Sequence, residues 1–144
     1  MNPEAEILVK WFKLAFKEPI IEKLGEDLER YGFDEAVDGF WIWDVVGDFE
    51  YYSEKWCRQL GYTKEQVGTS PEAWQKMITP KGLRVAFNNM SKHLNSNGEQ
   101  PFKQEVEYIH KNGSLVKLLC EGSIIRHDKF GFPSVVFGWH KLIN

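Results

Sequence analysis

The sequence contains two cysteines and four histidines, the residue types that most often bind metals or form covalent links. Cys57 and Cys120 are far apart, and neither has a second cysteine or a histidine at the spacing typical of zinc ligands. The pattern therefore predicts neither a disulfide framework nor a metal site. We expect both cysteines to be buried free thiols, which is the common state of an unpaired cysteine.

General acid–base catalysis would need a pair such as a histidine and an aspartate inside a cavity, as in α+β hydrolases and isomerases of this length. The aspartates considered, Asp44, Asp48 and Asp128, all fall at predicted strand ends or turns. Hydrogen bonds to nearby backbone amides explain an aspartate at such a position without catalysis. The sequence therefore favours a protein that is not an enzyme and has no catalytic residues.

Large apolar and aromatic residues suggest a pocket between a sheet and a helix. A binding site of this kind combines apolar walls with a few polar groups. The candidate lining residues are Trp41, Trp43, Tyr52, Trp56, Phe87, Met90, His93, Tyr108, Leu118 and Phe137, of which Tyr52, His93 and Tyr108 would supply the polar groups. The alternative is that these side chains fill the core and leave no cavity.

Strands at both ends of the chain would position these residues. The 144 residues, 42% of them hydrophobic, are enough for one compact domain. Residues 40–45 alternate so that Trp41 and Trp43 face one side while Phe40 and Ile42 face the other, which predicts a strand covered on both faces. Its partner would be residues 49–52, and later strands are expected at about 102–110, 115–126 and 134–141, with an Asn-Gly turn joining the first two of these.

Short helices are expected between the two groups of strands. Ser53 and Thr63 precede helical segments as capping residues, and Thr63 forms the capping-box pattern with Gln66. Ser70-Pro71 and Thr79-Pro80 each place a hydroxyl before a proline at the first helical position. The last helix, about residues 80–97, carries an apolar stripe that should lie over the sheet. The predicted fold class is α+β, an antiparallel sheet wrapped around a helical connector.

Residues 1–33 are predicted to form an N-terminal helical extension to a domain at residues 34–144. One apolar helical pattern lies between residues 7 and 16, and a second helix should run from about Pro19 to Gly32. The extension either covers an open face of the sheet or pairs with the same helices of a second chain, because the first apolar stripe is too broad for a single contact. The two roles are compatible.

Charge and hydropathy argue against two kinds of partner. Residues 1–38 carry five Lys and Arg against ten Asp and Glu, and residues 39–144 carry thirteen against eleven. Neither part has the concentrated basic face that nucleic acids require. No apolar run approaches the roughly 18–20 residues that span a bilayer, and the first residues lack the pattern of a secretion signal. We therefore expect a cytoplasmic protein that binds neither nucleic acid nor membrane.

Five fragments in a fixed order resemble the PAS domain family, and together they cover roughly residues 34–140. They are residues 39–44, 51–56, 60–62, 105–114 and 126–133. The sequence is most similar to the sensor subtype marked by Trp-x-Trp-Asp, Leu-Gly-Tyr and Lys-Asp-Gly-Ser signatures, the last written Lys-Asn-Gly-Ser here. The resemblance implies a five-stranded antiparallel sheet and a helical face that enclose a small pocket, which detects a ligand, a cofactor or a partner.

The resemblance also bears on cofactors, whose identity the sequence leaves unknown. Flavin-binding photosensors of similar fold use a cysteine in an Asn-Cys-Arg motif, and residues 69–77 contain no cysteine, so flavin-adduct chemistry is not expected. Haem would need an axial ligand, for which His93 is the weak candidate against the commoner surface or hydrogen-bonded histidine. No metal ligand is assigned.

Two functions follow from this resemblance. The first is a sensory domain that detects a small ligand or a partner and relays its state by dimer rearrangement to an effector such as a histidine kinase or a cyclase. The second is a ligand-free module for protein interaction and homodimer formation. The Asp-Ile-Thr that usually closes such domains is missing from residues 138–144. The N-terminal helices are therefore the expected exit for a signal.

Overall fold

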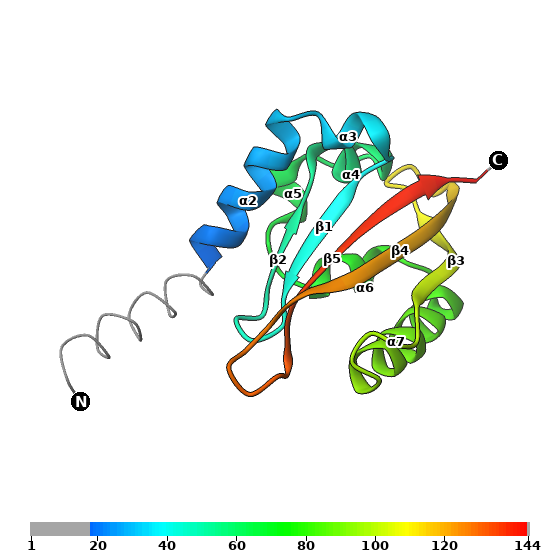
Figure 1. The fold of residues 1–144 in the computed structure, drawn as a ribbon. Coiled ribbons are helices and arrows are strands. Elements are labelled where there is room, and N and C mark those ends of the chain that lie inside the picture. Colours follow the sequence, from blue (N-terminus) through cyan, green and yellow to red (C-terminus); the bar gives the residue numbers. More distant parts are fainter. Residues whose placement is uncertain (1–17, 144) are drawn as a thin grey trace.

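A computed structural model describes residues 18–143 and contains a five-stranded antiparallel sheet with helices on both faces (Figure 1). The strand order is β2-β1-β5-β4-β3, so the first strand pairs with the last in the middle of the sheet. This arrangement confirms the predicted α+β fold. The strands are β1 (Phe40–Asp44), β2 (Phe49–Tyr52), β3 (Phe102–Ile109), β4 (Leu115–His127) and β5 (Pro133–Leu142).

The helices lie before β1 and between β2 and β3. Two precede the sheet, α2 (Glu18–Arg30) and α3 (Phe33–Ala36). The connector consists of α4 (Glu54–Gln59), α5 (Lys64–Val67), α6 (Glu72–Met77) and α7 (Pro80–Asn95). Within the described part of the chain, no helix is both long enough and apolar enough to cross a membrane.

Side-chain hydroxyls begin the connector helices as predicted. Ser53 Oγ accepts the Trp56 amide at 3.2 Å, and Thr79 Oγ1 accepts the Gly82 amide at 3.2 Å. Thr63 forms the reciprocal capping box at the start of α5. These bonds satisfy amides that have no partner within the helix. The helix after Ser70 starts one residue later than expected, at Glu72.

The last connector helix ends two residues earlier than predicted. Asn97 and Gly98 have φ angles of 53° and 89°, a left-handed conformation that ends a helix. The Gly98 amide donates to the His93 carbonyl at 2.8 Å, which closes the final turn. The chain then enters β3 at Phe102.

Strand β1 separates two apolar clusters. Trp41 belongs to the cluster on the face covered by α4, α6 and α7, which we call the inner face. Phe40 and Ile42 belong to the cluster on the face covered by α2, which we call the outer face. The predicted alternation along this strand is confirmed. Each face of the sheet therefore has its own core.

Helix α2 covers the outer face along β1 and β2 (Figure 1). Ile21 is buried there, and Leu28 packs beside it. Gly25 allows close approach, because a Cβ atom at this position would overlap the ring of Tyr51. The predicted second helix is thus confirmed, whereas the predicted helix at residues 7–16 lies outside the described residues.

Candidate functional site

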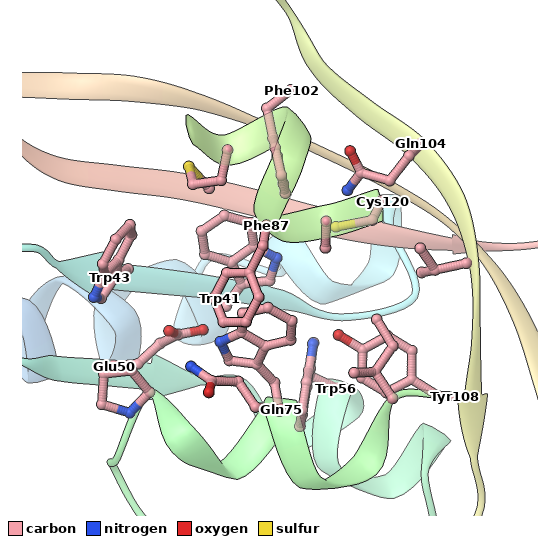
Figure 2. Close-up of a pocket in the computed structure, with 16 residues that line it drawn as sticks. Trp41, Trp43, Glu50, Trp56, Gln75, Phe87, Phe102, Gln104, Tyr108 and Cys120 are labelled. Atoms are coloured by element: carbon pink, nitrogen blue, oxygen red, sulfur yellow. The ribbon is translucent and has the colours of Figure 1, made fainter. Parts of the chain in front are cut away.

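A pocket lies between the inner face of the sheet and the helices α6 and α7 (Figure 2). The space that the centre of a water molecule can reach inside it is about 90 Å³. One water needs roughly 10–15 Å³ of this measure, so the pocket has room for several waters or a small ligand. Its walls are formed by Trp41, Trp43, Glu50, Trp56, Pro71, Trp74, Gln75, Ile78, Ala86, Phe87, Met90, Phe102, Gln104, Val106, Tyr108 and Cys120.

Four elements bring six of the ten predicted residues together around this pocket. Strand β1 supplies two tryptophans, α4 supplies one, α7 supplies two residues and β3 supplies a tyrosine. The alternation of β1 and the apolar stripe of α7 are the reasons that these side chains converge. The six are Trp41, Trp43, Trp56, Phe87, Met90 and Tyr108.

Two further candidates are buried in the inner cluster without lining the pocket. Leu118 is fully buried within the core. The Tyr52 hydroxyl donates to the Ser70 carbonyl at 2.8 Å, so it ties β2 to the segment before α6. Both residues therefore belong to the core of the inner face and not to the lining of the pocket.

His93 lies outside the pocket as a buried, hydrogen-bonded histidine. Its Nε2 accepts the Ile124 amide at 3.2 Å, and its Nδ1 lies 2.6 Å from the Gln100 carbonyl. A carbonyl only accepts, so Nδ1 donates in this contact. Both nitrogens are occupied by structural contacts. The described residues therefore do not fit a haem site with His93 as the iron ligand.

Phe137 lies on the outer face of the sheet rather than in the pocket. Its neighbour Val136 belongs to the inner cluster, whereas the Phe137 ring lies 5.4 Å from Phe33 and 5.8 Å from Phe40 between centroids. Strand β5 is apolar at both odd and even positions, so its sequence does not indicate which set faces inward. The structure thus corrects the prediction for this residue.

The prediction missed Glu50, the one carboxylate in the pocket wall. It stands opposite Trp43 in the β1–β2 pairing, and directly paired residues point to the same side of a sheet. The inward direction predicted for Trp43 could therefore have revealed the inward direction of Glu50.

Glu50 is isolated as well as buried. The residue is only 4% exposed. Its carboxyl group makes no hydrogen bond or ion pair with any described residue. Burial raises the pKa of this carboxyl group well above its usual value. This shift favours the protonated, neutral form of Glu50.

Several N–H groups around the pocket are also without partners among residues 18–143. They are the indole nitrogens of Trp43 and Trp56 and the amide nitrogen of Gln104. The Gln104 oxygen, in contrast, accepts from the Asn89 amide group at 3.0 Å. Buried polar groups are normally paired, so the unpaired N–H groups of the pocket wall are available to a ligand that accepts hydrogen bonds.

The pocket contains no group prepared for covalent chemistry. Burial raises the pKa of Cys120 to about 12, and it also raises the pKa of Tyr108 far above its usual value. Both groups are protonated at neutral pH, so the thiol is a poor nucleophile. Within the described residues, no group of three or more His, Cys, Asp or Glu could hold a metal ion. The arrangement is suited to binding.

The aspartates at the turns form local hydrogen bonds. Asp44 Oδ1 accepts the amides of Val46 at 3.1 Å and Gly47 at 2.8 Å. Asp128 Oδ1 accepts the amides of Phe130 and Phe132 at 2.8 and 3.0 Å. These contacts agree with the structural role that the sequence predicted for both.

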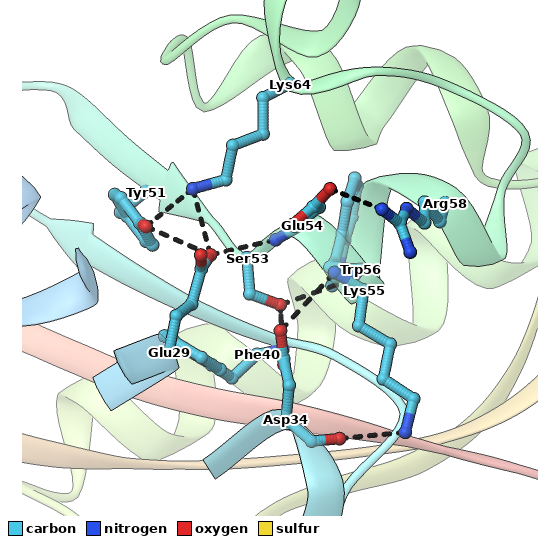
Figure 3. Close-up of polar contacts among 10 residues, drawn as sticks. All are labelled: Glu29, Asp34, Phe40, Tyr51, Ser53, Glu54, Lys55, Trp56, Arg58 and Lys64. Atoms are coloured by element: carbon cyan, nitrogen blue, oxygen red, sulfur yellow. Dashed lines mark hydrogen bonds and ion pairs between the residues drawn. The ribbon is translucent and has the colours of Figure 1, made fainter. Parts of the chain in front are cut away.

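A polar network joins α2 to the connector on the other side of β2 (Figure 3). Glu29 Oε1 accepts from the Tyr51 hydroxyl at 3.0 Å and from the Glu54 amide at 2.8 Å, and it lies 2.9 Å from Lys64 Nζ. Ser53 Oγ donates to Asp34 at 2.8 Å. The network fixes the strand that carries Glu50 relative to α2.

Comparisons with known proteins agree with this fold. A family model described as the PAS fold matches residues 49–139. Among solved structures, a sensory box histidine kinase/response regulator from Burkholderia thailandensis E264 has a TM-score of 0.64 at 16% identity, covering 79% of this chain and 84% of that chain. None of the curated protein sequences compared is significantly similar.

Two other solved structures show the range of proteins that share this fold. The N-terminal domain of a diguanylate cyclase with PAS/PAC sensor from Marinobacter aquaeolei has a TM-score of 0.62 at 15% identity, covering 72% of this chain and 93% of that chain. The PAS domain of the fruit-fly ELK potassium channel has a TM-score of 0.61 at 18% identity, covering 81% of this chain and 95% of that chain. At these identities the likeness concerns the fold alone.

Proposed function

The chain belongs to the PAS family, and from this premise we propose that it is a sensory signal-transduction domain that binds a small molecule in the inner-face pocket. The observation that carries the proposal is a cavity whose wall includes an isolated buried carboxyl group, Glu50. A group of this kind is costly to bury without a partner, and a ligand would supply one. The proposed function is binding and relay without catalysis.

The relatives support a role in signalling. The similar structures include one described as a sensory box histidine kinase/response regulator and one described as a diguanylate cyclase with a PAS/PAC sensor. We therefore propose that the natural effector of this domain is an enzyme of that kind, such as a histidine kinase or a cyclase.

The β1–β2 hairpin offers a physical route for the signal. Trp43 and Glu50 face the pocket, whereas Ile42 and Tyr51, their neighbours in sequence, face α2. Each strand of the hairpin thus contacts the ligand site on one side and the helix on the other. A ligand that shifts the hairpin would change the packing of α2, because packed interfaces respond to small displacements of their neighbours.

The outer side of α2 supports relay through a homodimer. On α2, Ile20 and Leu24 are 43% and 37% exposed, and Tyr31, just after the helix ends, is 84% exposed. The spacing of four residues places Ile20 and Leu24 next to each other on the helix. The exposed apolar stripe of α2, which lies within the predicted N-terminal extension at residues 1–33, favours pairing with a second copy of the chain.

Mass spectrometry of protein purified from its natural host tests the ligand proposal. We expect the native mass to exceed the denatured mass by the mass of a bound small molecule. Met90→Trp should remove that difference because it fills the pocket, whereas Asn88→Trp on the exposed side of α7 should retain it. A bare native mass for the wild-type protein would contradict ligand sensing and favour the ligand-free interaction module.

Sedimentation tests the dimer separately. The wild-type chain should sediment as a dimer, and the double variant Ile20→Glu/Leu24→Glu should sediment as a monomer because charges would disrupt the apolar stripe. Glu22→Gln, at an exposed position of the same helix, is the matched control. A dimer that survives the double substitution would place the interface elsewhere.

A further inference from the structure

The charge of the pocket restricts the class of ligand. Among the described residues that line it, Glu50 is the one carboxyl group, and none is a lysine, an arginine or a histidine. Although Trp43 and Trp56 offer N–H donors, an anionic ligand would gain no counter-charge in the pocket and would lie beside an acid. The composition of the walls therefore selects against carboxylates and phosphates and leaves neutral or cationic ligands.

The position of Glu50 favours a ligand that donates a hydrogen bond. Figure 2 shows the carboxyl group pointing from β2 toward the interior of the pocket. No described residue donates to it or pairs with it. An N–H group from a ligand would remove the cost of this missing partner, and a charged N–H would do so most strongly.

The aromatic walls favour a positive charge. Trp41, Trp43, Trp56 and Trp74 contribute indole rings, and Phe87 and Tyr108 add two further rings. Aromatic faces attract organic cations, and indoles do so best, especially where water is excluded. A carboxyl group among several indoles therefore combines the two features that recognise an ammonium group.

The groups around Glu50 do not already provide this positive charge. The titratable side chains that interact electrostatically with Glu50 are those of Tyr52, Tyr108 and Cys120. Burial raises the pKa of all three groups, so they remain neutral. On the connector side, the Thr69 carbonyl accepts the Glu50 backbone amide at 2.8 Å and contributes only an acceptor. The acid is therefore available to a ligand.

Building on the proposed function, we propose that the pocket binds a small organic cation, a primary or secondary ammonium, whose N–H donates to Glu50 and whose charge lies against the indole rings. Because burial favours the protonated form of Glu50 in the empty pocket, formation of the ion pair with the ammonium group releases the carboxyl proton to the buffer. The complex then contains one carboxylate and one ammonium group and has no net charge of its own.

Calorimetric titration with benzylammonium, benzyl alcohol and benzoate tests this proposal, because the three share one ring and differ in charge. We expect benzylammonium to bind at least about tenfold more tightly than benzyl alcohol, and benzoate to show no binding. Titrations in two buffers with different heats of ionisation should show close to one proton released for each benzylammonium bound. n-Butylammonium serves as a smaller cation.

Variants show whether Glu50 is responsible. Glu50→Gln should weaken benzylammonium binding at least about tenfold and abolish proton release, while its affinity for benzyl alcohol stays unchanged. Glu105→Gln, an exposed acid on β3, is the matched control and should bind like the wild type. A cooperative unfolding transition for each variant establishes that it is folded.

The outcomes separate this proposal from the proposed function. Equal or tighter binding of benzyl alcohol, retained cation affinity in Glu50→Gln, or no binding of either ammonium probe would overturn the proposal of a cationic ligand. The proposed function would still stand if native mass spectrometry found an uncharged or anionic ligand in the pocket. It fails only if host-purified protein carries no ligand.

Discussion

The two faces of the sheet are formed by the same strands but differ in how their buried side chains pack and form hydrogen bonds. On the outer face, the rings of Phe33, Phe40 and Phe137 lie 5.4 to 5.8 Å apart between centroids, and Glu29 accepts from several donors. On the inner face, a cavity remains and the carboxyl group of Glu50 has no partner among the described residues.

The difference suggests that the outer face stabilises the fold and that the inner face binds a ligand. Dense aromatic packing and paired polar groups stabilise the outer face and hold α2 against the sheet. The inner face gives up part of this stability, since both a cavity and an unpaired buried group cost free energy. Departures of this kind are expected where a protein binds something. The comparison therefore predicts unequal responses to substitution on the two faces.

The largest difference should come from removing one ring on each face. Phe40 is fully buried, so Phe40→Ala should lower the free energy of unfolding by about 3–5 kcal/mol. Phe87 borders the cavity and is 46% exposed, so Phe87→Ala should cost less than about 1.5 kcal/mol. Urea denaturation measures both. Equal losses would contradict the division between a packed face and a hollow one.

A second prediction concerns His140, which is buried against Trp56 and Tyr108 on the inner face. Burial lowers its pKa from 6.5 to about 3. Between these values the unfolded chain binds a proton that the folded chain does not, so stability falls as pH falls below about 6.5. The contribution of His140 should decrease by about 2 kcal/mol between pH 7 and pH 5.

Unfolding measurements at several pH values test this contribution. The variant His140→Phe should lose the part of the pH dependence that His140 causes, because phenylalanine does not titrate. The His127→Phe variant, at an exposed position of β4, controls for the loss of a histidine. Identical pH profiles for wild type and His140→Phe would show that the buried ring does not stay neutral.

A smaller effect is expected from the outer polar network. Glu29→Ala removes the acceptor for the Tyr51 hydroxyl and the Glu54 amide, so it should lower stability by about 1–2 kcal/mol. Glu22→Ala, at an exposed position of the same helix, should change stability by less than about 0.5 kcal/mol. Thermal and urea unfolding provide the comparison. Similar losses of stability in the two variants would show that the polar network does not stabilise the fold.

The smallest effect should have the opposite sign, at Glu50. The raised pKa means that the folded chain keeps a proton which the unfolded chain loses above about pH 4.5, so stability falls as pH rises through this window. Glu50→Gln removes this penalty and should stabilise the protein by about 1 kcal/mol at pH 8, with little change at pH 4. Destabilisation at pH 8 would mean that the carboxyl group has a partner in the folded protein.

Local sequence rules predicted the frame of the molecule. The capping residues Ser53, Thr63 and Thr79 and the alternation of β1 follow from short-range chemistry, so they could be read from neighbouring residues. The resemblance to PAS domains supplied the single five-stranded antiparallel sheet, which local patterns alone do not determine. The fold was therefore largely predictable.

The site was less predictable because it depends on pairing between distant segments. Phe137 was misplaced since β5 is apolar on both faces, and Glu50 was missed since its direction depends on its pairing with Trp43. The side chains of Trp74 and Gln104 reach the pocket only after α6 and β3 are placed around it. Composition indicates what a strand contains, whereas register decides where each side chain points.

The central claim is that ligand binding in the inner-face pocket changes the packing of α2 on the outer face. Hydrogen exchange of the amides in α2 tests this claim most directly. The measurement compares host-purified protein that retains its ligand with the same protein after ligand removal. Slower exchange in β1 and α2 of the liganded form, with the exposed β4–β5 turn unchanged, is the predicted result. Protection confined to α6 and α7, with α2 unaffected, would contradict a relay through the sheet.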